Sequence, residues 1–278
     1  MEIVFKNVSF VINNRTSLEK TILNDVSFSI VEGGIYSFIG ASNSGKSAIG
    51  RLISTLNTPT KGIVKLGKYK SDGSRRGLKE VRSKIGYVYQ NPYDMFFNKT
   101  VYDELVFGMK EFKYRIETLK KRVVEALELV GLSEEYLDKN PRQLSLVDAR
   151  RLSLACILIY NPKVIILDEM TNGLSYPEKR DLVRLLKKLK NEYKKTIIIL
   201  SKDTSFCYEV TDYVYLMYLT KIVKEGKKNL LEEYDLESIN LNTPQIISFV
   251  NECKKKGHDI NYYNNIHDLI KGVYRDVF

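Results

Sequence analysis

The segment GASNSGKS at residues 40–47 constrains the fold of this chain more than any other stretch. The apolar run IYSFI precedes it, and in the segment AIGRLISTL that follows apolar residues recur at helical spacing. The segment fits the pattern G-x-x-x-x-G-K-[ST], in which small residues join a buried strand to a helix. The sequence therefore predicts a strand, a glycine-rich loop and a helix, as in α/β domains.

Anion binding is the physical reason for this spacing. Small side chains let successive backbone N–H groups curl around phosphates, and the N-terminus of the helix adds its dipole. Lys46 would neutralise the β- and γ-phosphates of a bound nucleotide, and the Ser47 hydroxyl would bind Mg²⁺. A plain glycine-rich turn is the alternative interpretation. We predict that the nucleotide contacts the whole segment, namely Gly40, Ala41, Ser42, Asn43, Ser44, Gly45, Lys46, Ser47 and Ala48.

Two adjacent acids end the most apolar segment of the chain. KVIILDE at residues 163–169 is continuously apolar until Asp168 and Glu169, as is typical of a parallel strand buried on both faces. Ligands of parallel α/β sheets bind at the carboxyl ends of the strands. We therefore expect Asp168 to hold Mg²⁺ through a water molecule and Glu169 to orient or deprotonate the attacking water. The alternative is that the two acids only cap the following turn.

The remaining patterns predict how the chain is organised around these segments. EIVFKNVSFVI and NDVSFSIV alternate like strands and predict an N-terminal antiparallel β-subdomain. Residues of about 92–150 read as mainly helical, without a strand, and predict a helical subdomain that includes a helix SEEYLD with a serine N-cap. Asp148 is the predicted N-cap of the helix ARRLSLACILIY. Residues 1–225 would form a nucleotide-binding domain, and 226–278 an accessory C-terminal segment with helical patterns.

Composition excludes several classes of protein. No stretch approaches the roughly 20 apolar residues of a spanning helix, and the N-terminus MEIVFKNVSF has no secretory signal pattern. The three cysteines show neither disulfide nor metal spacing, so a cytosolic location is expected. The net charge of +10 would suit nucleic acid, but the lysines are spread over the whole chain, and no aromatic-basic interleaving marks a nucleic-acid surface. We expect no nucleic-acid partner.

With KIGYVYQNP, QLSLVDARRLSLACILIYNPKVIILDE and TIIILSKD at these separations, the chain resembles the nucleotide-binding subunits of ATP-binding cassette (ABC) transporters over about residues 1–225. The resemblance implies a P-loop NTPase fold and an ATP hydrolase that acts as a translocase. It also implies that Gln90 is the Q-loop glutamine, which reaches Mg²⁺ and water and couples the site to a membrane partner.

Three further segments are most similar to the ATPases of energy-coupling-factor transporters, which import vitamins and metal ions. They are YQNPYDMFFNKTVYDELVFG, VGLSEEYLDKNPRQLS and LESINLNTPQIISFVNECKKKGHDI. This resemblance implies a second ATPase subunit, a transmembrane coupling subunit and a substrate-binding membrane subunit. It places the chain peripherally at the cytoplasmic face of the cell membrane.

The family signature Leu-Ser-Gly-Gly-Gln is replaced by LSLVD at residues 144–148. The two glycines of the family let backbone N–H groups reach the γ-phosphate held by the other subunit, and Leu146 and Val147 would crowd that approach. Asp148 brings negative charge near a phosphate, which costs about 1–4 kcal/mol at 4 Å. We expect this signature half-site to be inactive.

Other departures affect hydrolysis. Lys202 stands at the position of the family's switch histidine, and lysine cannot relay a proton as imidazole does, which removes a factor of about 10²–10⁴ in rate. Ser175 occupies the D-loop aspartate position, and Met170 replaces the usual proline. The aromatic residue expected to stack on adenine aligns with Ile12, with Phe10 and Tyr69 as candidate substitutes.

By this resemblance the catalytic residues are Glu169, Gln90 and Lys202, and the magnesium ligands are Ser47, Gln90 and Asp168. A homodimer would have two defective sites, whereas a heterodimer would pair this phosphate loop with an intact signature, so we favour a heterodimer with weak turnover or turnover at one composite site. The alternative is a pseudo-ATPase that binds ATP structurally or regulates its partner. A cassette protein that acts on nucleic acid is a third hypothesis, but such proteins usually carry a second cassette or a long coiled coil, and neither fits in this chain.

Overall fold

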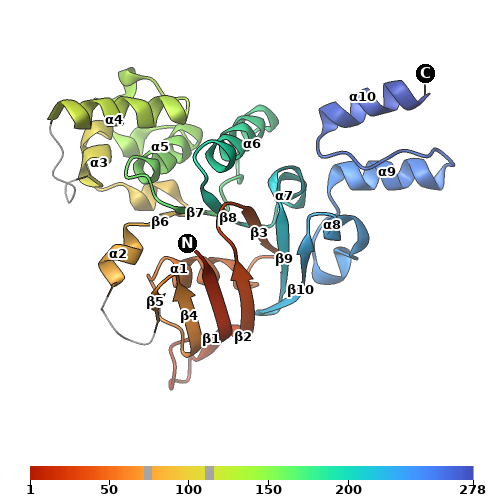
Figure 1. Cartoon of the computed structure of the whole chain (residues 1–278), viewed down its shortest axis with the longest axis horizontal. Helices are drawn as coiled ribbons and strands as arrows, with labels where there is room; N and C mark the ends of the chain where they lie inside the picture. The colour runs from red at the N-terminus through yellow and green to blue at the C-terminus, as the bar shows by residue number, and fades with distance from the viewer. Residues whose placement is uncertain (72–76, 110–115, 278) are drawn as a thin grey trace.

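A six-stranded sheet forms the centre of the computed structural model, which describes residues 1–71, 77–109 and 116–277 (Figure 1). Its strand order is β10-β9-β3-β8-β7-β6, and its strands run parallel except for β10, which pairs antiparallel with β9. The predicted α/β fold is confirmed. The strands are β3 (Ile35–Gly40), β6 (Ile85–Val88), β7 (Val164–Asp168), β8 (Thr196–Ser201), β9 (Tyr213–Tyr218) and β10 (Lys221–Lys227).

The middle of this sheet is covered on both faces. Every residue of β7 and β8 is buried, which explains why both strands are continuous apolar runs in the sequence. The parallel pairing of β3 with β8 and of β7 with β8 brings the carboxyl ends of these three strands to one edge. The phosphate loop and the two acids therefore meet at that edge.

A second sheet confirms the predicted N-terminal antiparallel unit. Its order is β2-β1-β4-β5, with β1 (Ile3–Ile12) paired antiparallel to both β2 and β4. Aromatic rings join it to the central sheet, because Phe28 stacks on Phe5 at 4.3 Å between ring centroids and contacts Phe38 and Tyr215. The other strands are β2 (Lys20–Ile30), β4 (Lys61–Leu66) and β5 (Tyr69–Lys70).

Helices α3, α4 and α5 gather on one side of the central sheet (Figure 1). In the described part of residues 92–150 no strand occurs, as predicted, while residues 110–115 of that range lie outside the described residues. Gly131, with φ of 77°, lies just beyond the end of α4, where a left-handed residue commonly ends a helix. The elements are α2 (Leu78–Arg82), η1 (Pro92–Met95), α3 (Val101–Phe107), α4 (Ile116–Leu129), η3 (Glu134–Tyr136), η4 (Pro141–Gln143) and α5 (Leu146–Leu158).

Two local predictions in this region are wrong. Helix α5 begins at Leu146, and its N-cap is Ser145, whose hydroxyl accepts a hydrogen bond from the backbone N–H of Asp148 at 3.1 Å. Asp148 lies in the first turn instead, where a carboxylate complements the helix dipole. The segment SEEYLD forms a single 3₁₀ turn, and the Ser133 side chain makes no capping hydrogen bond there.

The C-terminal part packs partly on the main core. Leu231, Leu236 and Ile247 belong to the core beside the central sheet, whereas Val250 and Leu269 pack in a separate small cluster. Strand β10 continues past residue 225, and the division of the chain at that point stays a prediction. Across the described ranges no helix is both long and apolar enough to span a bilayer. The remaining helices are α1 (Lys46–Ile53), α6 (Tyr176–Asn191), α7 (Thr204–Val210), α8 (Leu230–Glu233), η5 (Glu237–Ile239), α9 (Gln245–Lys255) and α10 (Ile266–Val277).

Candidate functional site

The glycine-rich loop runs from the end of β3 at Gly40 to the start of α1 at Lys46. Gly45 has φ of 104°, and a Cβ atom there would lie 2.7 Å from the carbonyl oxygen of Ile22. At Gly40 a Cβ atom would lie 2.6 Å from the carbonyl oxygen of Met217. Both positions therefore require glycine, because backbone from other strands passes directly against the loop.

Two polar side chains inside the loop are set up for an anion. Ser44 is buried, and its hydroxyl has no hydrogen-bond partner among the residues the structure describes. The Lys46 Nζ atom donates to the carbonyl oxygens of Gly40 at 2.7 Å and Ala41 at 2.9 Å, and it lies 3.4 Å from Glu169 Oε1. Burial lowers the pKa of Lys46, and the nearby Glu169 carboxylate opposes that shift. The loop thus offers an unused hydroxyl and a desolvated ammonium group.

Asp168 ends β7 opposite this loop and is 3 % exposed. Its Oδ1 atom accepts a hydrogen bond from the Ser47 hydroxyl at 3.1 Å, and its Oδ2 atom accepts one from the Tyr87 hydroxyl at 2.6 Å. Burial, with the adjacent Asp168 carboxylate, raises the pKa of Tyr87 well above its usual range, so the phenol stays a donor. The pair of Asp168 and Ser47 joins the two elements that the sequence predicted to share the site.

Glu169 follows directly, with φ of 46° in the left-handed region. Its backbone N–H donates to Leu200, and its backbone carbonyl accepts from Arg150 Nη1 at 3.1 Å. Its carboxylate turns toward Lys46 and the backbone N–H of Lys202, at 3.4 Å in each case. Among the described residues, neither acid side chain accepts a hydrogen bond from the turn that follows it. The geometry thus favours a ligand-binding role for the two acids over the alternative that they only cap the following turn.

A hollow of about 540 Å³ opens beside the loop and gathers most of the predicted residues. Gln90 and Lys202 line it, while Asp168 lies behind Ser47 and is not among the lining residues. Of the three candidates for an adenine contact, Phe10 and Ile12 line the hollow, whereas Tyr69 lines a separate one. The lining residues are Phe10, Ile12, Lys20, Thr21, Ile22, Ser42, Asn43, Ser44, Gly45, Lys46, Ser47, Ala48, Arg51, Asn57, Gln90, Glu169, Asn172, Lys202 and Thr220.

The polar side chains of the segment LSLVD, at the start of α5, form hydrogen bonds within the chain. The Ser145 hydroxyl donates to Asp148 Oδ2 at 2.9 Å, and the Tyr136 hydroxyl donates to the same oxygen at 3.3 Å. Leu146 remains 38 % exposed, and its side chain approaches Gly173 so closely that a Cβ atom there would lie 3.0 Å from it. The serine hydroxyl and the carboxylate are therefore engaged with each other, behind an exposed leucine.

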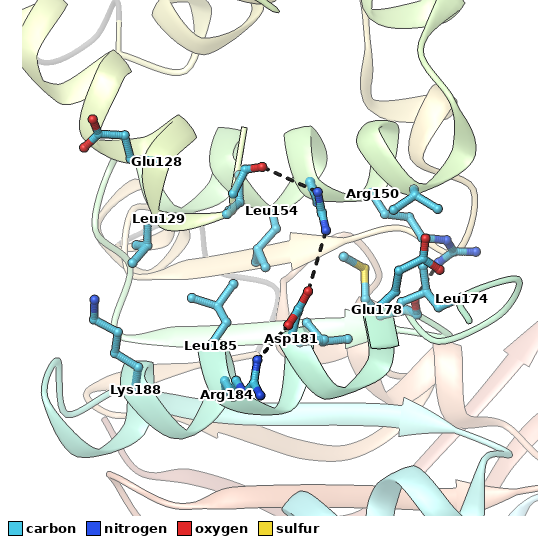
Figure 2. A pocket seen from close by; sticks show the side chains of 16 residues that line it. Glu128, Leu129, Arg150, Leu154, Leu174, Glu178, Asp181, Arg184, Leu185 and Lys188 are labelled. Atoms are coloured by element: carbon cyan, nitrogen blue, oxygen red, sulfur yellow. Dashed lines mark hydrogen bonds and ion pairs between the residues drawn. The ribbon is translucent and has the colours of Figure 1, made fainter. Parts of the chain in front are cut away.

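A second hollow of about 350 Å³ lies between α5 and α6 (Figure 2). Arg151 spans it, with Nη1 3.4 Å from the carbonyl oxygen of Gly131 and Nη2 4.0 Å from Asp181. Arg150 also lines it, and its Nη1 atom reaches the carbonyl oxygens of Glu169 and Met170 at 3.1 Å each. This hollow therefore lies behind the acids and does not contain the phosphate loop.

Sequence reasoning did not identify Tyr87 and Arg150 as residues of the site. A tyrosine in the strand KIGYVYQ reads as apolar core, and an arginine in a helix reads as solvent-exposed. The only hints in the sequence that these two residues belong to the site were a tyrosine hydroxyl within a buried strand and an arginine charge on the apolar side of α5. Neither hint indicates which atom the side chain contacts.

Comparisons with known proteins agree with this geometry. A family model described as "ABC transporter" matches residues 23–172. The energy-coupling factor transporter ATP-binding protein EcfA2 of Caldanaerobacter subterraneus subsp. tengcongensis is 34 % identical, over 92 % of this chain and 91 % of the relative. EcfA3 of Oenococcus oeni is 33 % identical, over 98 % of this chain and 96 % of the relative.

Two solved structures are also similar. The ATP-binding cassette MJ0796, described as a dimeric post-hydrolysis state bound to ADP and Pi, has a TM-score of 0.75 and 27 % identity, over 81 % of this chain and 98 % of that one. The structure of cbiO1 from Clostridium perfringens, described as part of the ABC transporter complex cbiONQ, has a TM-score of 0.74 and 27 % identity, over 90 % of this chain and 98 % of that one.

Proposed function

The chain belongs to the ABC transporter family, and within it to the ATP-binding proteins of energy-coupling factor transporters, and from this premise we propose that it is the ATP-binding subunit of an importer of that type. Closure on ATP would drive the import of a vitamin or a metal ion. The single observation that carries the proposal is the meeting of the phosphate loop with Asp168 and Glu169 at one edge of the sheet.

The loop supplies the nucleotide contacts. The Ser44 hydroxyl, which has no hydrogen-bond partner within residues 1–71, 77–109 and 116–277, is available to a phosphate oxygen, since a buried hydroxyl without a partner costs free energy that a ligand can recover. Lys46 would exchange its bonds to the loop carbonyls for the β- and γ-phosphates, which its position at the start of α1 allows. These groups bind and orient the triphosphate.

The residues around Asp168 fit Mg²⁺. The Ser47 hydroxyl and the Asp168 carboxylate place two oxygen donors 3.1 Å apart, which is the donor type that this ion prefers, and Gln90 lines the same hollow. Bound Mg²⁺ would neutralise charge on the phosphate oxygens. Ser47, Asp168 and Gln90 would hold it. Glu169, whose carboxylate reaches into the site, would accept a proton from the attacking water or orient it.

The hydrogen bonds between Ser145 and Asp148 at the start of α5 support an asymmetric assembly. Ser145 and Asp148 satisfy each other, and the backbone beneath them carries Leu146 and Val147 in place of glycines. This face would therefore offer few hydrogen-bond donors to a phosphate held by another subunit. We therefore propose a heterodimer in which a second ATPase supplies an intact signature to this chain's loop, so that turnover is confined to one composite site.

The proposed membrane partners are inferred from the names and descriptions of the similar proteins. The relatives are named as transporter ATP-binding proteins, and cbiO1 is described as part of a transporter complex. We propose that a transmembrane coupling subunit and a substrate-binding membrane subunit hold this chain peripherally at the cytoplasmic face of the membrane. No nucleic acid takes part in this proposal.

Ser44→Ala tests the loop directly in the full-length chain. Without nucleotide it should raise the free energy of unfolding by up to about 1 kcal/mol, because it removes a buried hydroxyl that has no partner in the described part of the chain, and it should weaken ATP binding measured by calorimetry. Ser54→Ala is the matched control, since that hydroxyl bonds to the Gly50 carbonyl at the far end of α1. An unchanged ATP affinity in the Ser44 variant would contradict the proposed contacts.

Turnover by the reconstituted importer separates this proposal from the pseudo-ATPase. The complex should release phosphate, and Glu169→Gln in this chain should reduce that rate by a factor of about 10²–10⁴. If the rate does not depend on Glu169 while ATP binding persists, this chain holds nucleotide without hydrolysing it. That result would favour the structural or regulatory role.

A further inference from the structure

The buried side chain of Tyr87 lies between the two elements that carry the expected magnesium ligands. It rises from β6, is 7 % exposed, and donates its hydroxyl to Asp168 Oδ2 at 2.6 Å. The other oxygen of that carboxylate faces the Ser47 hydroxyl at 3.1 Å. Each Asp168 oxygen therefore has its own hydroxyl partner, one on α1 and one on β6.

The packing around the ring fixes its position. A Cβ atom at Gly50 would lie 2.6 Å from Tyr87 Cε2, so the ring presses on α1 where that helix has no side chain. Gly50 is three residues after Ser47 and lies on the same face of the helix. The Tyr89 ring contacts the Tyr87 ring edge to face, with 5.0 Å between centroids. The phenol is thus held against the helix that carries Ser47.

We propose that Tyr87 is a positioning residue for magnesium, which holds Asp168 in the rotamer that presents Oδ1 to the ion beside Ser47. This inference rests on the proposed function. The terminal torsion of aspartate has a broad energy well, so packing and hydrogen bonds must select its orientation. A short hydrogen bond to a charged carboxylate is a strong constraint of this kind. Oδ2 is engaged by the phenol, and Oδ1 remains as the metal-facing atom.

The same strand also leads to Gln90. Tyr87 lies three residues before Gln90, which lines the hollow beside the phosphate loop. All three expected magnesium ligands are thus close in structure or sequence to this tyrosine. Partners that orient metal ligands typically change metal affinity by 10- to 100-fold when removed, so a measurable effect is expected.

Tyr87→Phe removes the hydroxyl and keeps the ring. The measurement is the dissociation constant of ATP for the full-length chain, taken once in EDTA and once with saturating Mg²⁺. For the wild type, Mg²⁺ should tighten ATP binding. In Tyr87→Phe that gain should shrink by roughly tenfold, while the constant in EDTA stays unchanged. Tyr89→Phe is the matched control, and both constants should match the wild type, because no hydrogen bond of its hydroxyl is found in the described part of the chain.

The other outcomes of this experiment would contradict the proposed role of Tyr87 or the proposed function. If Tyr87→Phe keeps the full gain from Mg²⁺, or if Mg²⁺ gives the wild type no gain, the positioning role is wrong. If it weakens ATP binding equally in EDTA and in Mg²⁺ and lowers the melting temperature, the hydroxyl has only a structural role, and the inference also fails. If the wild type binds no ATP under either condition, the proposed function itself fails, which is a separate result.

Discussion

Arg150→Met tests whether the helix that carries the altered signature also holds the acidic turn in place. Arg150 is 4 % exposed and lines the hollow between α5 and α6 (Figure 2), and its Nη1 atom donates to the backbone carbonyls of Glu169 and Met170. Methionine has a similar length and cannot donate. The substitution therefore leaves two buried carbonyl groups without their charged partner.

The expected loss follows from these two contacts. The Glu169 carbonyl also accepts a hydrogen bond from the backbone N–H of Asn172 at 3.2 Å, so among the described residues the Met170 carbonyl is the one left without a donor, and an unpaired buried acceptor costs about 1–3 kcal/mol. Burial lowers the pKa of Arg150, which shows that its charge is poorly solvated, and its removal returns part of that cost. We expect a net decrease of about 1–3 kcal/mol in the free energy of unfolding, measured by urea denaturation of the full-length chain.

The adjacent arginine provides the control. Arg151 is partly exposed and pairs with Asp181 at only 4.0 Å, so Arg151→Met should cost less than about 1 kcal/mol. Glu169 has a left-handed backbone that must be held by its surroundings, so Arg150→Met should also lower ATP turnover more than ATP affinity. Equal and small losses of stability in both variants would refute the argument that Arg150 secures this turn.

Two further predictions concern other parts of the chain. Replacing LSLVD by LSGGQ with L146G, V147G and D148Q should raise the rate of phosphate release by a homodimer of this chain. The same change should lower the melting temperature, because glycine costs about 1 kcal/mol per helical position. An unchanged rate of phosphate release would contradict an inactive signature. Burial raises the pKa of Glu209 above its ordinary value of 4.5, so the ionised form is disfavoured on folding. Glu209→Gln should therefore stabilise the chain at pH 7, with a gain that fades as the pH falls toward 4.5 and is absent below it. A gain independent of pH in urea denaturation would contradict this origin.

Much of the fold could be predicted from the sequence because its strongest signals are local. The phosphate loop is a contiguous segment, and β7 and β8 are continuous apolar runs because both faces of each strand are buried. The start of α5 was predicted wrongly, because Ser145 and Asp148 are both good N-cap residues three positions apart. Apolar periodicity does not locate a helix end within that distance.

The inner part of the site could not be predicted because it depends on contacts between distant segments. The bond from Tyr87 to Asp168 joins residues 81 positions apart, and the bond from Arg150 to Glu169 joins residues 19 apart. A sequence shows the residue types but not which atoms meet across the sheet. The adenine contact could not be predicted for the same reason, since all three candidates belong to the N-terminal sheet and only Phe10 and Ile12 line the hollow beside the phosphate loop.

Calorimetric titration of magnesium-ATP into the full-length chain measures whether residues 40–47 form a phosphate site. We expect saturable binding of one ATP per chain, and Lys46→Ala should weaken it by about 10- to 100-fold, because a charge-assisted contact is worth about 1.5–3 kcal/mol. Identical binding curves for the two proteins, or no binding by the folded wild type either alone or in its assembled complex, would contradict a phosphate site at residues 40–47.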